Sequence, residues 1–284
     1  MLRKRWKKTV FMTIATMFLL AGCNSGIASE IGTSDTLPVD FSEIYTLSDA
    51  DKNTVAENPK QIEFEAGEDI YLIEEPGSYL LSGVYTGRLQ INVQDEMVHL
   101  ILQDADLKST DGPAIYVESA AKVIITVPEG SNSILTDSTN ATDSSIAKAC
   151  IYSEDDLTIN GSGSLQIYGY NKDAIRTKDT LKLLDLQLTV LAKGDGLRGN
   201  DGVVVQTSSL EIECEGTGIY TEKTDKENRG YVDIASGTVN IIAGKYGVSA
   251  SENMYIHDCK ANIYGIIQNL KSGKEQFIEE GCLE

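Results

Sequence analysis

Two sets of side chains recur at a regular spacing along the chain and could do chemistry. In the first set, Tyr116, Tyr152, Arg176, Arg198 and Tyr220 each follow an apolar residue that is itself preceded by a glycine or another small residue. Tyrosine rings offer flat apolar faces to sugar rings, and arginine offers a planar fork to carboxylates. One column of these side chains on an outer surface would bind a sugar polymer. The alternative is that outward tyrosines simply suit a β surface.

The second set carries carboxylate and amide oxygens. It lies two residues before, or three to four residues after, the same apolar positions and consists of Asp155, Asp173, Asp179, Asp195, Asn200 and Asp201. Stacking would bring like charges to about 5 Å, where they repel by roughly 1–3 kcal/mol unless a cation lies between them. Calcium takes six to eight oxygen ligands of these kinds. The pattern therefore predicts a calcium site, with the capping of tight turns by Asp and Asn as the alternative.

The composition excludes several other classes of site. The chain has 284 residues and a net charge of -19, so the phosphates of a nucleic acid would be repelled. This charge does not exclude an anionic partner that is held through a bound cation. His99 and His257 are the two histidines, which leaves little for a histidine-based metal site or catalytic triad.

The spacing of the two sets comes from a repeat of about 22 residues. Each repeat also contains two further apolar alternations, such as Leu181-x-Leu183 and Leu188-x-Val190. Three period-two strands per repeat, separated by Gly, Asn and Asp turns, predict an all-β fold. We expect a right-handed parallel β-helix (solenoid) with three short strands per coil of about 22 residues, the hand following the rule for parallel crossovers. Polar insertions at 131–148 and 222–229 should form loops.

The N-terminal segment is typical of an export signal. Residues 1–9 are basic, and the apolar run Val10–Ala21 is too short to span a bilayer. The run ends in Leu20-Ala21-Gly22-Cys23, which resembles the lipobox of bacterial lipoproteins. This resemblance implies cleavage before Cys23, lipid on its sulfur, and a position on the extracellular face of the cell membrane. An ordinary secretory signal is the alternative.

The chain is therefore expected to have three parts: a signal peptide at 1–22, a polar lipid-anchored tether at 23–60, and a folded carbohydrate-binding domain at 61–284. Within the domain, four cysteines allow three complete pairings and the sequence selects none of them. These residues are Cys150, Cys214, Cys259 and Cys282. No C-x-x-C spacing occurs, so we expect buried free thiols.

The repeat resembles a known family, the calcium-associated, carbohydrate-binding β-helix proteins of clostridia and related bacteria, whose fold resembles that of pectate lyases. The resemblance covers roughly residues 62–265. The segments that carry it are Pro76–Gly83, Val98–Asp137 around Asp111–Val117, Asp173-Ala174-Ile175 and Gly194-Asp195-Gly196-Leu197.

The resemblance implies binding of pectin-like or cellulose-like polymers, with calcium held at Asp-Gly turns by Asp173, Asp179, Asp195 and Asp201. The acid is missing at Gly216-Thr217-Gly218, so the resemblance does not extend the calcium site beyond the third Asp-Gly turn.

The sequence as a whole predicts a cell-surface lipoprotein that binds plant-type polysaccharide with the help of calcium. The membrane would be contacted only through the lipid, and no catalytic residue is assigned. One alternative is a calcium-dependent polysaccharide (pectate) lyase, with Arg176, Arg198 or Lys172 as the base. A second alternative is a structural surface protein without a sugar ligand.

Overall fold

The computed structural model describes residues 43–63, 69–225 and 228–284. The predicted signal peptide at 1–22, the lipidated Cys23 and most of the tether lie outside the described residues. Among the described residues, no helix is long and apolar enough to cross a membrane. One short helix, α1 (Asp49–Lys52), accompanies twenty-three strands, so the fold is all-β as expected.

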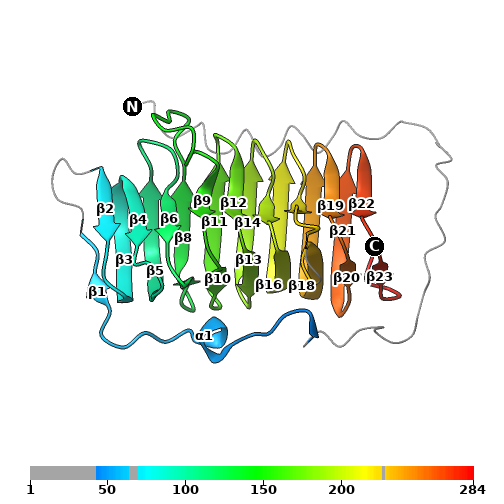
Figure 1. Cartoon of the computed structure of the whole chain (residues 1–284), viewed down its shortest axis with the longest axis horizontal. Coiled ribbons are helices and arrows are strands. Elements are labelled where there is room, and N and C mark those ends of the chain that lie inside the picture. Colours follow the sequence, from blue (N-terminus) through cyan, green and yellow to red (C-terminus); the bar gives the residue numbers. More distant parts are fainter. Residues whose placement is uncertain (1–42, 64–68, 226–227) are drawn as a thin grey trace, which may run out of the picture. The chain divides into compact units, whose positions relative to one another are not determined.

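The strands form two sheets (Figure 1). The larger sheet has fourteen strands: β1 (Lys60–Gln61), β3 (Gly77–Thr86), β5 (Met97–Lys108), β7 (Lys122–Thr126), β8 (Asn132–Thr136), β10 (Leu157–Asn160), β11 (Ser164–Gly169), β13 (Thr180–Leu184), β14 (Gln187–Ala192), β16 (Gly202–Cys214), β18 (Tyr231–Ala243), β20 (Met254–Ile256), β21 (Cys259–Gly265) and β23 (Gln276–Ile278). The smaller sheet has nine: β2 (Ile70–Ile73), β4 (Arg88–Asn92), β6 (Ile115–Ser119), β9 (Ala149–Ser153), β12 (Asp173–Thr177), β15 (Leu197–Gly199), β17 (Ile219–Thr221), β19 (Tyr246–Ala250) and β22 (Gln268–Ser272).

All the strand pairs of the described residues are parallel, and equivalent residues of successive repeats are partners. For example, Ile151, Ile175, Leu197 and Ile219 are consecutive partners in the nine-stranded sheet. Their side chains are fully buried, as are those of most other apolar residues at alternate positions. The period-two pattern thus builds one continuous apolar core, and it sends the intervening side chains outward.

The predicted strand organisation is wrong. We expected a right-handed parallel β-helix with three separate short strands per coil. Instead, the pairing closes a ring of eight parallel strands (β5, β7, β10, β13, β16, β14, β11 and β8) beside the separate nine-stranded sheet.

The ring closes because two long strands each have two sets of partners. In β16, residues 202–206 pair with β13 and residues 209–214 pair with β14. Between them lie Thr207 and Ser208, through which the strand continues without a break. Where the strands do end, Gly161 and Asp185 adopt positive φ values of 105° and 63°.

Part of the predicted tether is packed against the fold. We call residues 43–53 the strap. In Figure 1 the strap, with α1 near its C-terminal end, runs along one side of the fourteen-stranded sheet. Helix α1 contacts β10, and Tyr45 stacks on Tyr231 of β18 with ring centroids 5.7 Å apart. The inner end of the predicted tether is therefore part of the folded unit.

Candidate functional site

The predicted aromatic and cationic column exists as a ladder on the nine-stranded sheet. Tyr116, Tyr152, Arg176, Arg198 and Tyr220 are consecutive partners in β6, β9, β12, β15 and β17. The register places them at the outward-pointing position of five successive strands, about 4.8 Å apart. The prediction that these five side chains form one column is therefore confirmed. The exposed fraction of the side chains differs along the ladder.

The two tyrosines on β6 and β9, at one end of the ladder, are covered by other side chains. Tyr116 and Tyr152 stack on each other at 5.7 Å and are only 8% and 3% exposed. The segment 131–148 is not a loop throughout, contrary to expectation, because Asn132–Thr136 forms β8; Ile146, from its remaining loop, packs against the cluster that the two rings form with Ala149. Their apolar faces are therefore used inside the protein, and a sugar ring cannot stack on them in this conformation.

The other three members of the ladder lie on β12, β15 and β17. We call them the arginine face: Arg176, Arg198 and Tyr220. The Arg198 guanidinium lies over the Tyr220 ring at 4.7 Å and also pairs with Glu222. Burial alone would lower the pKa of Arg198, but the hydrogen bond and charge of Glu222 raise it above its usual value. Arg198 is therefore a fixed cation that holds the Glu222 carboxylate, rather than a group that accepts a proton.

By the repeat, the predicted acidic residues fall into two columns, the first with Asp173 and Asp195 and the second with Asp155, Asp179 and Asp201. The first column caps turns. The Asp173 carboxylate accepts a hydrogen bond from the Asp195 backbone N–H at 2.8 Å, and Asp195 accepts one from Thr217 N–H at the same distance. Their other oxygens face Arg176 and Arg198, at 3.9 and 3.5 Å. Because each carboxylate already has a backbone donor and a cation, Asp173 and Asp195 do not fit a calcium site.

The second predicted acidic column retains oxygens without partners. Asp155 accepts a hydrogen bond from Ala120 N–H, and Asp201 pairs with Arg229 through one oxygen. The other oxygen of Asp201 and the amide oxygen of Asn200 are buried without a hydrogen-bond partner. Orphaned buried oxygens beside carboxylates are the donor set that calcium prefers.

Electrostatics in this second column also favour a cation. Burial raises the pKa of Asp179, and the Asp201 carboxylate raises it further. However, no group of three or more His, Cys, Asp or Glu side chains that could hold a metal ion occurs in the described ranges. An ion at Asp179, Asn200 and Asp201 would therefore need amide or backbone carbonyl ligands as well.

A different exposed surface escaped the sequence analysis. On the outer side of β11, β14, β16, β18 and β21, one register position forms what we call the outer ladder: Tyr168, Leu191, Glu213, Ile242 and Tyr264. Its apolar members are unusually exposed, with Leu191 at 37%, Ile242 at 60% and Tyr264 at 55%. Stacking of Tyr170 on Tyr168 at 5.7 Å widens the aromatic end.

A polar column lies beside the outer ladder on the same face. This amide ladder, two residues earlier on each strand, consists of Gln166, Thr189, Glu211, Asn240 and Asn262. Neither ladder contains a lysine or arginine. The sequence contained the information needed to find both ladders. Their residues alternate with the buried apolar residues of the last strand of each repeat, such as Leu188 and Val190.

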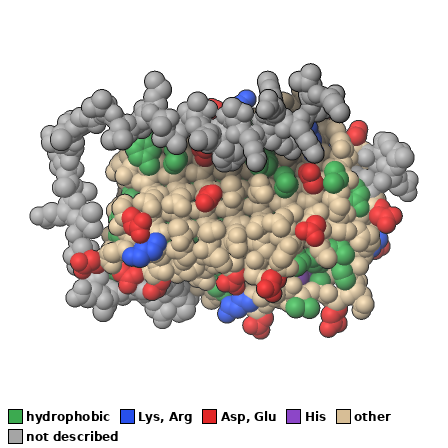
Figure 2. Space-filling model, turned by 180° about the vertical axis from the view of Figure 1, so that it is seen from behind, with side chains coloured by type: hydrophobic (Ala, Val, Ile, Leu, Met, Phe, Trp, Pro, Cys, Tyr) green, Lys and Arg blue, Asp and Glu red, His purple; other side chains and the backbone are tan. Residues whose placement is uncertain are grey.

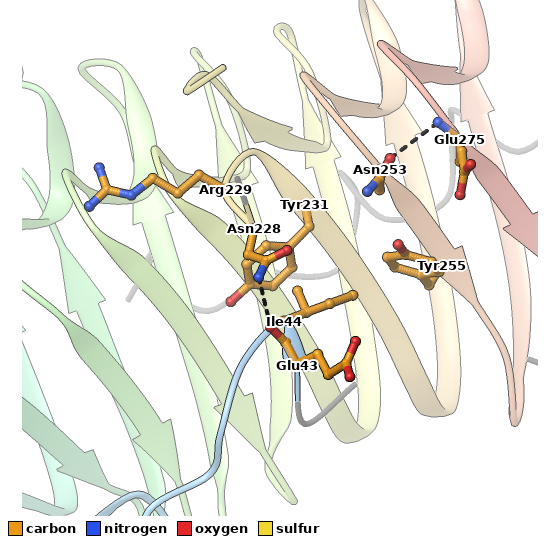
Figure 3. Close-up of a pocket in the computed structure, with 8 residues that line it drawn as sticks. All are labelled: Glu43, Ile44, Asn228, Arg229, Tyr231, Asn253, Tyr255 and Glu275. Atoms are coloured by element: carbon orange, nitrogen blue, oxygen red, sulfur yellow. Dashed lines mark hydrogen bonds between the residues drawn. The ribbon is translucent and has the colours of Figure 1, made fainter. Parts of the chain in front are cut away.

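A pocket of about 240 Å³ lies where the strap meets β18 and β20 (Figure 3). The residues that line it are Glu43, Ile44, Asn228, Arg229, Tyr231, Asn253, Tyr255 and Glu275. Tyr231 and Tyr255 are only 4% and 1% exposed, and in Figure 3 Arg229 extends away from the other lining residues. The pocket therefore presents two carboxylates and amides but no open aromatic face.

The surface as a whole is acidic. Figure 2 shows a face on which Asp and Glu side chains outnumber Lys and Arg side chains, with hydrophobic side chains scattered between them. An anionic ligand can be attracted only locally, at a place such as the arginine face, against the net charge of -19.

Comparisons with known proteins agree with one another. The family described as carbohydrate-binding domain-containing protein matches residues 67–279. A protein of the same description from Acetivibrio thermocellus is 30% identical over 219 residues, which are 74% of this chain and 76% of that protein. The solved structure of a polysaccharide lyase-like protein from C. thermocellum, a gadolinium derivative, is similar with a TM-score of 0.70 and 30% identity, covering 77% of this chain and 91% of that one. The chain therefore belongs to the family of carbohydrate-binding domain-containing proteins.

Proposed function

We propose that the protein binds polysaccharide, and that the outer ladder and the amide ladder together form the surface for an uncharged polymer. The observation that carries this proposal is the register of exposed Leu191, Ile242 and Tyr264 along one flat face. Ile242 and Tyr264 are adjacent partners and Leu191 lies beyond Glu213 in the same register, so the apolar side chains offer contacts for the C–H faces of sugar rings. The family membership supports carbohydrate as the ligand class.

The neighbouring amide ladder supplies the polar half of such a site. Asn240, Asn262 and Thr189 carry donors and acceptors that match sugar hydroxyl groups. Glu211 and Glu213 are carboxylates without a cation in either ladder, so this face would repel a uronate polymer. An uncharged glucan is therefore the better fit.

Retention on regenerated cellulose tests this assignment. Replacing both Tyr168 and Tyr264 by Ala should weaken retention about ten-fold, since each aromatic contact contributes roughly 0.5–1.5 kcal/mol. Val55→Ala is the matched control, because Val55 is 69% exposed and lies outside both ladders. Unchanged retention of the folded double variant would contradict the assignment of this face.

A second surface, the arginine face, suits an anionic polymer. Arg176 and Arg198 are adjacent partners, so two guanidinium groups follow one another at the strand spacing. We propose that they hold uronate carboxylates of a pectin-like polymer, and that calcium at Asp179, Asn200 and Asp201 reduces the local negative charge. Retention on polygalacturonate should fall with a chelator and with Arg176→Gln or Arg198→Gln, whereas retention on cellulose should not change.

Binding is favoured over the lyase alternative by the state of Arg198, one of the three candidate bases. A lyase needs a group that removes a proton from the sugar. Glu222 raises the pKa of Arg198, so this guanidinium stays protonated. Incubation with polygalacturonate and calcium should give no unsaturated product that absorbs in the ultraviolet. A structural protein without a sugar ligand would show no retention on either polymer.

We further propose that the chain is anchored by lipid on Cys23 at the extracellular face of the membrane. The support is the basic head, the short apolar run and Leu20-Ala21-Gly22-Cys23. Cys23→Ala should move the protein from the detergent phase to the aqueous phase in a phase-separation assay, and partition of the wild type into the aqueous phase would contradict the proposal.

A further inference from the structure

Two of the four buried cysteines lie together at the C-terminal end of the fold. Cys259 begins β21, and Cys282 is two residues before the end of the chain. The Ala261 N–H donates to the Cys282 carbonyl at 2.7 Å, and the Glu284 N–H donates to the Ala261 carbonyl at 3.0 Å. The backbone thus lays the last residues beside β21, in a parallel bridge between Ala261 and Leu283.

The two cysteines are buried free thiols, as expected from the sequence. Cys259 and Cys282 are 7% and 3% exposed, and the Cys282 thiol lies 3.5 Å from a Glu279 carboxylate oxygen. Burial, followed by the charge and hydrogen bond of Cys282, raises the pKa of Cys259 to about 12, in keeping with the backbone contacts that bring the two residues together. Cys150 and Cys214 have backbone amides as their hydrogen-bond neighbours instead.

We propose that Cys259 and Cys282 form a disulfide bond that fastens the C-terminal segment to β21. Each thiol gives up one proton and one electron as the S–S bond forms. The two electrons reduce an external disulfide, either of a small molecule or of another protein, to two thiols by way of a mixed disulfide. Because both thiols are buried, this exchange takes place while the last residues are detached from β21, before the segment closes.

The proposed bond would protect the end of the sheet. β23 pairs with β20, Leu283 bridges to Ala261, and the Lys260 ammonium donates to the Gly281 carbonyl at 2.9 Å. Backbone hydrogen bonds from Glu279 to Ile256 and from Glu284 to Ala261 add to these contacts, all of which are noncovalent. A covalent link would keep the segment over the strand edges, which is where unwanted strand pairing begins.

Peptide mapping tests the bond in the unaltered protein. The purified chain is equilibrated with oxidised and reduced glutathione, its free thiols are alkylated in denaturant, and it is digested with trypsin without reductant. We expect peptides 246–260 and 275–284 to appear joined, two hydrogens lighter than their sum, while Cys150 and Cys214 are alkylated. Alkylation of all four cysteines, or joining of any other pair, would overturn the proposal.

Thermal unfolding gives a second measurement. Reductant should lower the melting temperature of the oxidised protein by roughly 5–10 °C, as expected for a bond that closes a loop of about 24 residues. Cys282→Ser should abolish this response, and Cys214→Ser, at an equally buried position, should keep it. A wild-type melting temperature that does not respond to reductant would also count against the bond.

Discussion

Asp51 and Lys182 are 131 residues apart in the sequence, and the Lys182 ammonium donates a hydrogen bond to the Asp51 carboxylate at 3.0 Å. The other Asp51 oxygen accepts from Lys122 at 2.8 Å and from Thr158 at 2.6 Å. Asp51 is completely buried. One carboxylate of the strap therefore joins side chains from β7, β10 and β13.

Removing this carboxylate should detach the strap. Asp51→Ala leaves Lys122 and Lys182 without their anion, and uncompensated buried charge typically costs about 3–5 kcal/mol. We expect a loss of this size in the free energy of unfolding by denaturant, together with faster proteolysis of residues 43–53. Asp49→Ala is the matched control, since Asp49 lies exposed on the same helix and should change stability by less than about 0.5 kcal/mol.

The same interaction has a pH dependence of known sign. Burial alone would raise the pKa of Asp51, but hydrogen bonds from Lys122, Thr158 and the other donors lower it well below its usual value. The stabilisation is therefore present above about pH 4 and is lost as the pH falls through the lowered pKa. The stability difference between wild type and Asp51→Ala should shrink in acid, and a constant difference would contradict the ion pairing.

Asp173 should behave in the opposite way. Burial, followed by the Asp195 charge, raises the pKa of Asp173 to about 6, above its value in the unfolded chain. Its contribution is therefore fully present below about pH 4 and is lost as the pH rises through about 6. Asp173→Asn keeps an acceptor for the Asp195 N–H but cannot ionise. We expect the variant to exceed the wild type by about 1–3 kcal/mol at pH 8 and to equal it near pH 4, measured by urea unfolding.

Calcium should act through the second acidic column rather than the first. At a hundred-fold excess over its dissociation constant, a bound ion stabilises a protein by about 2.7 kcal/mol. We expect calcium to raise the melting temperature of the wild type, and Asp179→Asn with Asp201→Asn to remove this effect. Asp173→Asn should keep the effect, because Asp173 already has a backbone donor and an arginine. An unchanged wild-type melting temperature would exclude the site.

The sequence predicted the stacking of residues well because β strands impose a strict period of two. The partners Tyr152, Arg176 and Arg198 followed directly from the repeat. The ends of strands were harder to predict, because no single turn residue decides them. β10 and β13 end beside Gly161 and Asp185, which have positive φ values, yet β5 and β18 continue through Asp104 and Gly237, which have positive φ values as well.

Exposure could not be predicted in the same way. A period of two shows that Tyr116 and Tyr152 point away from the core, but not that Ile146 from a polar insertion will cover them. Similarly, nothing local marks Asp51 as a buried ion, because Lys122 and Lys182 are distant in the sequence. The repeat pattern therefore could not predict contacts between the repeats and segments that lie outside them.

The covered tyrosines lead to a last prediction that separates packing from binding. Tyr116→Ala removes a ring that is 8% exposed and stacked on Tyr152, so the folded state should lose about 3–5 kcal/mol. Retention on polygalacturonate and on cellulose, per folded molecule, should not change. Arg198→Gln is the contrasting variant, since it should weaken retention on polygalacturonate. If Tyr116→Ala instead kept its stability and lost retention, the loop at 137–148 would have to open and expose the two rings to the polymer.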